Sequence, residues 1–266
     1  RRSSAMSWPM WEAAFNEVWR PELAIVGLTA LAAGFVRGMA GFGAALILTP
    51  VFSAFYNPAL AVPTLGVADF LIGLPMTIQA WRRCRWREVL PLAAAAIVML
   101  PLGTWVLATA SPVILRIAMS LCVLLAVGVL AMGWRYAGQP GLPATLLVGG
   151  ASGVMAGAIG IGGPPVVVFW LAGQANAALA RANTIAFFGV TSIGTQSMYW
   201  LNGLLTPAVF VMAALLVPVY GAGLYTGART FSVVSERTFR RIAFTLVAAV
   251  AVSTLVAAVA SLVWAH

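Results

Sequence analysis

Long uncharged hydrophobic runs, separated by short polar or charged breaks, make up most of the chain. They cover residues 22–56, 59–80, 89–109, 112–134, 142–173, 178–201, 206–228 and 239–264. Most of these runs have the ~20 residues that a helix needs to cross the hydrocarbon layer, and none alternates like a membrane β-strand. The pattern predicts an all-α integral membrane protein, with residues 1–266 forming a single transmembrane domain.

The N-terminal segment, residues 1–21, has a different pattern. Trp8, Trp11, Phe15 and Trp19 fall at helical spacing among polar residues. A helix with one aromatic face and one polar face lies in the plane of the membrane interface. We therefore expect an interfacial N-terminal segment that contacts the lipid bilayer.

One pattern of glycines occurs twice at a constant offset. Its members are Gly34, Gly38, Gly41 and Gly43, which recur as Gly153, Gly157, Gly160 and Gly162. Trp81 and Trp200 are separated by the same offset. This indicates a duplicated unit, with internal repeat 1 at about 22–134 and internal repeat 2 at about 142–264.

Arginine-rich loops exchange places between the two repeats. Repeat 1 has four arginines after its second run, at Arg82, Arg83, Arg85 and Arg87. The equivalent loop of repeat 2, around Asn202, is uncharged, and the arginines follow the third run instead, at Arg229, Arg237, Arg240 and Arg241. Because arginine concentrates in cytoplasmic loops, equivalent loops face opposite sides of the membrane, and the repeats are inverted.

Inversion requires an odd number of membrane crossings in each repeat. The first run of each repeat, 22–56 or 142–173, is too short for two full spans and long for one. We predict that each is a glycine-rich broken helix or re-entrant hairpin followed by three transmembrane helices, with the two hairpin tips meeting inside the membrane. Both chain termini then lie outside, and Arg116 is an exception to the cytoplasmic placement of arginine.

The hairpin tips are expected at residues 41–43 and 160–165. Broken backbone at membrane depth is tolerated where protein buries it or where it lines a wet cavity, and a helix that begins there offers free N–H groups to an anion. Five glycines are assigned to the tips, namely Gly41, Gly43, Gly160, Gly162 and Gly163. The alternative is close helix packing, which we favour for Gly34, Gly38, Gly153 and Gly157.

Two blocks around these glycines, GFVRGMAGFGAALILTP at 34–50 and SGVMAGAIGIGGPPVVVFWLAG at 152–173, resemble the sulfite exporter TauE/SafE family. The resemblance covers nearly the whole chain after the N-terminal segment. It implies a bacterial inner-membrane protein that moves sulfur-containing and related small anions. The first block departs from the family pattern at Arg37, Ala44 and Ala45. We therefore expect the second tip to be the more regular backbone cradle and the first tip to contribute a side-chain charge.

Arg37 is a basic residue in the middle of an apolar run, where an uncompensated charge costs at least about 3 kcal/mol. In one interpretation its guanidinium binds the anion through paired hydrogen bonds. In the other it forms a structural ion pair with Asp69, the only acid within a predicted span. Asp69 is also the candidate proton-coupling group, and it can hold Arg37 when no anion is bound.

Polar residues later in the sequence extend the predicted site. The substrate-binding residues that we predict are Arg37, Gly38, Gly41, Phe42, Gly43, Gly160, Ile161, Gly162, Gly163, Pro164, Pro165, Asn183 and Thr184. Hydroxyl side chains that could line the same path are Thr191, Ser192, Thr195 and Ser197. Gln79 is assigned to hydrogen bonding between helices, and for Thr64 and Gln196 both roles stay open.

Composition narrows the classes of function. The chain is 62% hydrophobic and 8% charged, and its net charge of +9 comes from arginine without any lysine. Most arginines lie in short loops, where they set membrane orientation, so nucleic acid is not an expected partner. The two cysteines lack a partner for a disulfide and the one histidine is terminal, so we expect no metal, no cofactor and no enzyme activity. Without lysine the chain also lacks a Walker-type ATP site.

The sequence therefore favours a secondary transporter that works by alternating access, and the family resemblance implies that it exports sulfite or an organosulfonate. Its expected partners are a small oxyanion, a coupling proton or cation, and the lipid bilayer. An anion channel of the same architecture is the alternative. Neither a monomer nor a homo-oligomer is excluded.

Overall fold

The structure is a computed structural model that describes residues 8–132, 141–171 and 177–230. Within these ranges the chain is all helical, with ten helices and no strands. The helices are α1 (Trp8–Val18), α2 (Leu23–Ala40), α3 (Ala44–Phe55), α4 (Pro58–Trp81), α5 (Trp86–Thr109), α6 (Pro112–Met132), α7 (Leu142–Ile159), α8 (Gly163–Leu171), α9 (Ala177–Leu201) and α10 (Pro207–Thr230). The last predicted run, 239–264, and the arginines at 135, 237, 240 and 241 lie outside the described residues.

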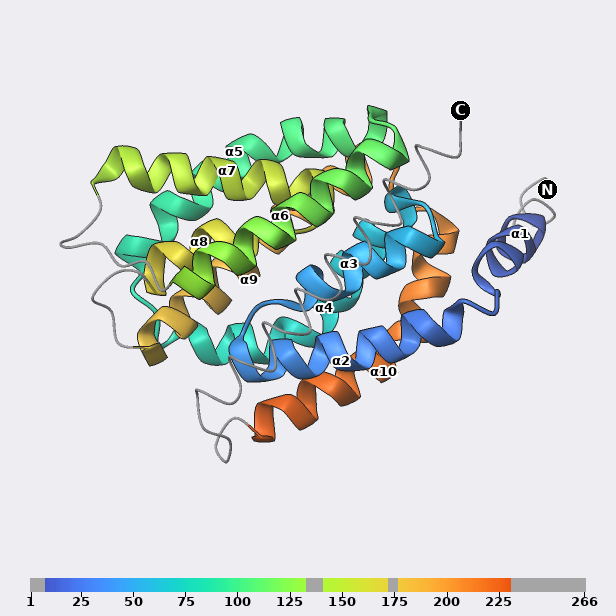
Figure 1. Ribbon diagram of the computed structural model, residues 1–266, viewed down its shortest axis with the longest axis horizontal. Helices are drawn as coiled ribbons and strands as arrows, with labels where there is room; N and C mark the ends of the chain where they lie inside the picture. The colour runs from blue at the N-terminus through green and yellow to red at the C-terminus, as the bar shows by residue number, and fades with distance from the viewer. Residues whose placement is uncertain (1–7, 133–140, 172–176, 231–266) are drawn as a thin grey trace, which may run out of the picture.

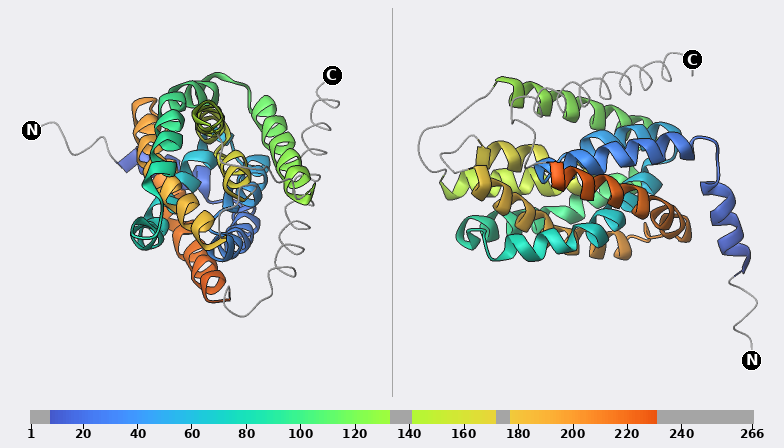
Figure 2. Two further views of the ribbon diagram at one scale, coloured as in Figure 1. Left: turned by 90° about the vertical axis from the view of Figure 1, so that its left-hand side faces the viewer. Right: turned by 90° about the horizontal axis from the view of Figure 1, so that it is seen from below.

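Five of these helices are long and apolar enough to cross a membrane, namely α2, α4, α5, α7 and α10. Helix α9 is equally long, but it carries polar side chains such as Asn183, Thr191 and Gln196 and is not in this set. The helices of the bundle run side by side along the long axis of the molecule, whereas α1 lies across one end of it (Figures 1 and 2).

Helix α1 shows how an amphipathic segment attaches to this end of the bundle. Its buried residues, Ala14 and Val18, pack against the core, and the hydroxyl of Tyr56 donates a hydrogen bond of 2.9 Å to the carbonyl oxygen of Val18. Trp11, Phe15 and Trp19 remain exposed. The aromatic face that the sequence predicts is therefore free to contact the membrane interface.

Two pairs of helices cross with their backbones in close contact. In the pair α2 and α10, a Cβ atom added to Gly34 or Gly38 would collide with the carbonyl oxygen of Tyr220 or Leu224. In the pair α5 and α7, a Cβ atom on Gly153 would collide with the carbonyl oxygen of Ala96. Small residues allow two helices to approach this closely. The surroundings of these glycines therefore agree with the packing interpretation.

Both predicted hairpins are broken where the glycines stand. Helix α2 is followed by Gly41 (φ 81°) and Gly43 (φ 100°), and α7 is followed by Gly160 (φ 71°). These left-handed conformations favour glycine because a side chain would meet the following carbonyl oxygen. After each break the chain turns back, since α3 packs on α2 and α8 packs on α7 (Figure 1).

Arg116, the exception in the predicted charge distribution, has a local role. It lies on α6, and its guanidinium donates hydrogen bonds to the carbonyl oxygens of Ser53 and Tyr56 at the end of α3. The last carbonyls of a helix have no partner within the helix. Arg116 therefore caps the short helix α3. This contact explains why an arginine stands here, although the position does not follow the cytoplasmic placement of the other arginines.

Candidate functional site

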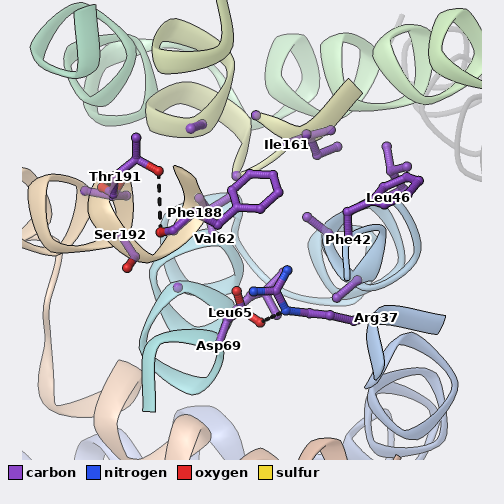
Figure 3. Close-up of a pocket in the computed structure, with 18 of the residues that line it drawn as sticks. Arg37, Phe42, Leu46, Val62, Leu65, Asp69, Ile161, Phe188, Thr191 and Ser192 are labelled. Carbon is purple, nitrogen blue, oxygen red and sulfur yellow. Dashed lines mark hydrogen bonds and ion pairs between the residues drawn. The ribbon is translucent and has the colours of Figure 1, made fainter. Parts of the chain in front are cut away.

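The two helix breaks line one cavity of about 110 Å³. Residues from α2, α3, α4 and α9 complete its wall (Figure 3). The predicted site residues found in the wall are Arg37, Phe42, Gly43, Asp69, Gly160, Ile161, Gly162, Gly163 and Pro164. The structure thus brings residues from both predicted repeats to one place.

Five predicted site residues do not line the cavity, namely Gly38, Gly41, Pro165, Asn183 and Thr184. The amide of Asn183 accepts a hydrogen bond from the backbone N–H of Arg85 (2.8 Å) and donates one to Glu88 (2.9 Å). The hydroxyl of Thr184 donates to the carbonyl oxygen of Ala180 within its own helix. The observed role of Asn183 is to fix the start of α5 against α9.

Arg37 and Asp69 form an ion pair at the cavity wall. The Arg37 side chain is only 11% exposed, and its guanidinium also lies 5.7 Å from the centre of the Phe188 ring. Asp69 accepts a second hydrogen bond, of 2.6 Å, from the hydroxyl of Tyr220. The ion pair that the sequence offered as one interpretation of Arg37 is therefore present in this structure.

Charged side chains satisfy the backbone at the first break. Arg37 reaches forward to the carbonyl oxygen of Gly41 (3.4 Å), and Arg181 of α9 donates to the carbonyl oxygen of Gly38 (3.1 Å). Both carbonyls belong to the C-terminal end of α2, where carbonyl oxygens are left without intrahelical partners and carry partial negative charge. Two arginines thus compensate one helix end inside the protein.

At the second break, neutral hydroxyl groups donate hydrogen bonds to backbone carbonyl oxygens. Ser152 donates a hydrogen bond of 2.6 Å to the carbonyl oxygen of Gly162, and Tyr199 donates one of 3.1 Å to that of Ala156. Tyr199 is almost fully buried and comes from α9. The second break is therefore held by side chains that cannot lose or gain charge at ordinary pH.

The first turns of α3 and α8 differ in backbone donors. The cavity-lining residues Ala44 and Ala45 begin α3 and keep their N–H groups, which have no intrahelical acceptor. In α8 two of the first three residues are Pro164 and Pro165, and proline has no N–H. This differs from the expectation that the second tip is the better backbone cradle, because the prolines remove the donors that such a cradle needs.

A polar stripe on α9 forms the remaining wall. Phe188, Ser192, Thr195 and Tyr199 follow one another at helical spacing, with Thr191 and Gln196 beside them. The sequence predicted the three hydroxyl residues but not Phe188 or Tyr199. Their spacing of three or four residues is the signal that could have found them, because such residues share one face of a helix. The buried Oε1 atom of Gln196 has no hydrogen-bond partner.

The polar groups of the cavity wall indicate the kind of ligand that it suits. In residues 8–132, 141–171 and 177–230, no group of three or more His, Cys, Asp and Glu side chains comes together. The cavity offers one guanidinium paired with the Asp69 carboxylate, backbone N–H groups and neutral polar side chains. These groups suit the oxygens of a small anion.

Comparison with known proteins agrees with this chemistry. The family described as sulfite exporter TauE/SafE matches residues 26–254. A protein of Cupriavidus necator named "Probable sulfite/organosulfonate exporter TauE" is 30% identical over 257 residues, which cover 90% of this chain and 96% of that protein. No solved structure matches the chain. The chain is thus a multi-pass membrane protein and belongs to the sulfite exporter TauE/SafE family.

Proposed function

We propose that the protein is a secondary transporter that exports a small sulfur-containing anion, sulfite or an organosulfonate, across the bacterial inner membrane. The observation that carries this proposal is the cavity in which both helix breaks and Arg37 meet. The name of the Cupriavidus necator relative refers to the same class of anion. A cavity of about 110 Å³ has room for several water molecules, each of which needs roughly 10–15 Å³, or for one small polyatomic anion.

The anion would bind between Arg37 and the start of α3. A guanidinium presents several N–H donors in a plane, which fits the oxygens of a sulfite or sulfonate group. The N–H groups of Ala44 and Ala45 add backbone donors at a helix N-terminus, where partial positive charge favours an anion. Gly43, Gly160 and Gly162 keep the backbone close to the ligand. We leave Asn183 and Thr184 out of the proposed site, because their polar atoms bond other groups.

Alternating access would follow from two inverted repeats, about 22–134 and 142–264. The packing of the helices supports this proposal. Helix α2 packs along α10, and α7, its counterpart in repeat 2, packs along α5, the counterpart of α10. Helix α2 also runs opposite to α7 along the molecule (Figure 1). Two equivalent halves with opposite directions can open a central site first to one side and then to the other.

The topology that goes with this proposal places both termini outside and the loop arginines, such as Arg82 and Arg229, in the cytoplasm. Single cysteines introduced at these two positions, in a chain without Cys84 and Cys122, should react with a membrane-impermeant maleimide only after the cells are opened. Reaction at either position in intact cells would contradict the proposed orientation.

The test of function is anion transport by the purified protein in liposomes. We expect uptake of labelled sulfite that is accelerated by unlabelled sulfite or methanesulfonate inside the vesicles, because a carrier exchanges its substrates whereas a channel does not. Arg37→Ala should abolish this uptake. Arg85→Ala is the matched control, since Arg85 is 62% exposed and pairs with Glu88 outside the cavity. Uptake unchanged by Arg37→Ala would refute the proposed site, and uptake without exchange would favour the channel.

A further inference from the structure

Two donors converge on one oxygen of the Asp69 carboxylate. The Nε atom of Arg37 and the hydroxyl of Tyr220 both contact Oδ1 of Asp69. The Asp69 side chain is 26% exposed and lines the cavity, whereas the Tyr220 side chain is fully buried behind it. Asp69 is therefore accessible from the cavity and anchored from the opposite side.

The charges in the cavity wall cancel. Among the described lining residues, Arg37 and Asp69 are the two charged side chains. Two other helices that pack on α4 place polar or charged groups near the cavity. Helix α10 contributes Tyr220, and α9 contributes Tyr199, whose hydroxyl donates to Ala156, and Arg181, whose guanidinium reaches Gly38.

The remaining neighbours of α4 add no charge at Asp69. Helix α3 has no charged residue, Arg116 of α6 bonds the end of α3, and Glu88 of α5 bonds Arg85 and Asn183. Arg37 is thus the cation that faces Asp69. An anion that binds Arg37 must compete with the carboxylate for it.

Binding of an anion without any other change would leave two negative charges beside one guanidinium. An uncompensated charge at membrane depth is strongly unfavourable. A proton on Asp69 removes the excess, and the neutral acid still accepts the Tyr220 hydrogen bond. One singly charged anion then balances Arg37, whereas a doubly charged anion leaves one negative charge without a partner.

We propose that the cavity binds a singly charged sulfur oxyanion, such as a sulfonate or hydrogen sulfite, together with one proton that Asp69 accepts from water when the anion replaces it on Arg37. This inference rests on the proposed function and adds the charge state of the substrate. It implies that anion and proton cross the membrane in the same direction, so that the outward gradient of the anion itself drives export. It also implies that sulfate and other dianions bind more weakly than monosulfonates of similar size.

The test uses methanesulfonate, because a sulfonate keeps one negative charge throughout the neutral pH range. Its binding to the purified full-length protein is measured by calorimetry in two buffers with different heats of ionisation, which gives the number of protons taken up. We expect about one proton taken up per anion, and an affinity that falls as the pH rises. Sulfate should bind at least about tenfold more weakly, since an unpaired charge costs more than 1.4 kcal/mol.

Asp69→Asn imitates the protonated acid and should bind methanesulfonate with the same affinity at every pH and without proton uptake. Glu12→Gln is the matched control, because Glu12 is an exposed acid on α1, and it should keep the pH dependence of the wild type. If the Asp69 variant does not fold, the number of protons that the wild type takes up per methanesulfonate still tests the inference.

The two proposals fail in different ways. Binding of methanesulfonate without proton uptake, or equal binding of sulfate, would overturn the charge inference and leave the transport function standing. If the wild type binds neither sulfite nor methanesulfonate at any pH and transports neither, the proposed function fails, and the inference fails with it.

Discussion

The break between α2 and α3 and the break between α7 and α8 have the same backbone plan but different chemistry. In each, a glycine with positive φ ends the first helix and donates its N–H to the carbonyl oxygen four residues earlier, Gly41 to Arg37 and Gly160 to Ala156. Around the first break, backbone carbonyl oxygens accept hydrogen bonds from arginines. Around the second they are met by the hydroxyls of Ser152 and Tyr199.

We expect this difference to separate a break that binds the substrate from one that is structural. A guanidinium that caps a helix end can exchange one acceptor for another, because its several donors and its fixed charge suit any nearby anion. A buried hydroxyl that bonds one carbonyl has its single proton committed. The start of the second helix adds to the contrast, since Ala44 and Ala45 offer N–H groups where Pro164 and Pro165 have none. We therefore expect substrate effects at the first break and stability effects at the second.

The largest effect is expected when the side chains that bond the carbonyl oxygens at the two breaks are replaced by alanine. Arg37→Ala should lower transport by about thirtyfold or more, because truncation of one partner of a buried charge pair costs roughly 2–5 kcal/mol. Ser152→Ala should leave transport nearly unchanged and lower the free energy of unfolding by about 1–3 kcal/mol, since the buried carbonyl oxygen of Gly162 loses its donor. Transport in liposomes and unfolding in detergent measure the two effects.

The double variant Arg37→Ala/Asp69→Asn separates charge burial from transport. It removes both charges of the pair, so it should unfold at a higher temperature than Arg37→Ala alone while transport stays lost. Equal loss of transport in Ser152→Ala and Arg37→Ala would show that the two breaks do not differ in role.

The next effect concerns the backbone donors of the first break. The double variant Ala44→Gly/Ala45→Pro copies the start of α8 onto α3 and removes one N–H group from the cavity. We expect the affinity for methanesulfonate to fall by about tenfold or more, because a hydrogen bond to a charged group contributes about 1.5–3 kcal/mol. Ala44→Gly alone, which keeps the N–H, is the control. If both variants bind like the wild type, the anion does not contact the start of α3.

A smaller effect is expected at the glycines themselves. Gly43→Ala and Gly160→Ala should each lower the free energy of unfolding by about 1–2 kcal/mol, because alanine is strained at the positive φ that both positions adopt. The first break contains two such glycines, so Gly41→Ala/Gly43→Ala should cost more than the single change at the second. Gly27→Ala is the control, since it lies within α2 with no atom near the added Cβ. If Gly43→Ala lowers the free energy of unfolding no more than Gly27→Ala does, the positive φ at Gly43 is contradicted.

Local signals explain what the sequence could predict. The helices lie close to the predicted runs, as α4 (Pro58–Trp81) and α9 (Ala177–Leu201) show, because apolar length and flanking polar residues are properties of each segment alone. The breaks at Gly41 and Gly160 follow from glycine spacing in the same way. The ion pair between Arg37 and Asp69 could be predicted because few charged residues occur within the apolar runs.

Contacts between distant segments explain what the sequence could not predict. Tyr220 is separated from Asp69 by 151 residues, and nothing near either residue indicates their hydrogen bond. Asn183 was assigned to the site because it is polar and lies in a span, but which way a helical side chain points depends on how the helix packs. The missing N–H groups of Pro164 and Pro165 were readable from the sequence. Their consequence became plain only when both helix starts were found to line one cavity.

The smallest effect is expected in the difference between two tyrosine variants that each lose only a hydroxyl. Tyr199 and Tyr220 are both almost fully buried, but the first bonds a neutral carbonyl and the second a carboxylate. The carbonyl oxygen of Ala156 keeps the N–H of Gly160 as a donor, so Tyr199→Phe should lower the free energy of unfolding by only about 0.5–1.5 kcal/mol. Tyr220→Phe should cost about 1.5–3 kcal/mol, because hydrogen bonds to charged groups are stronger. Equal costs in detergent unfolding would mean that Asp69 is already neutral in the resting protein, and the contrast between a charged and a neutral break would then rest on Arg37 and Arg181 alone.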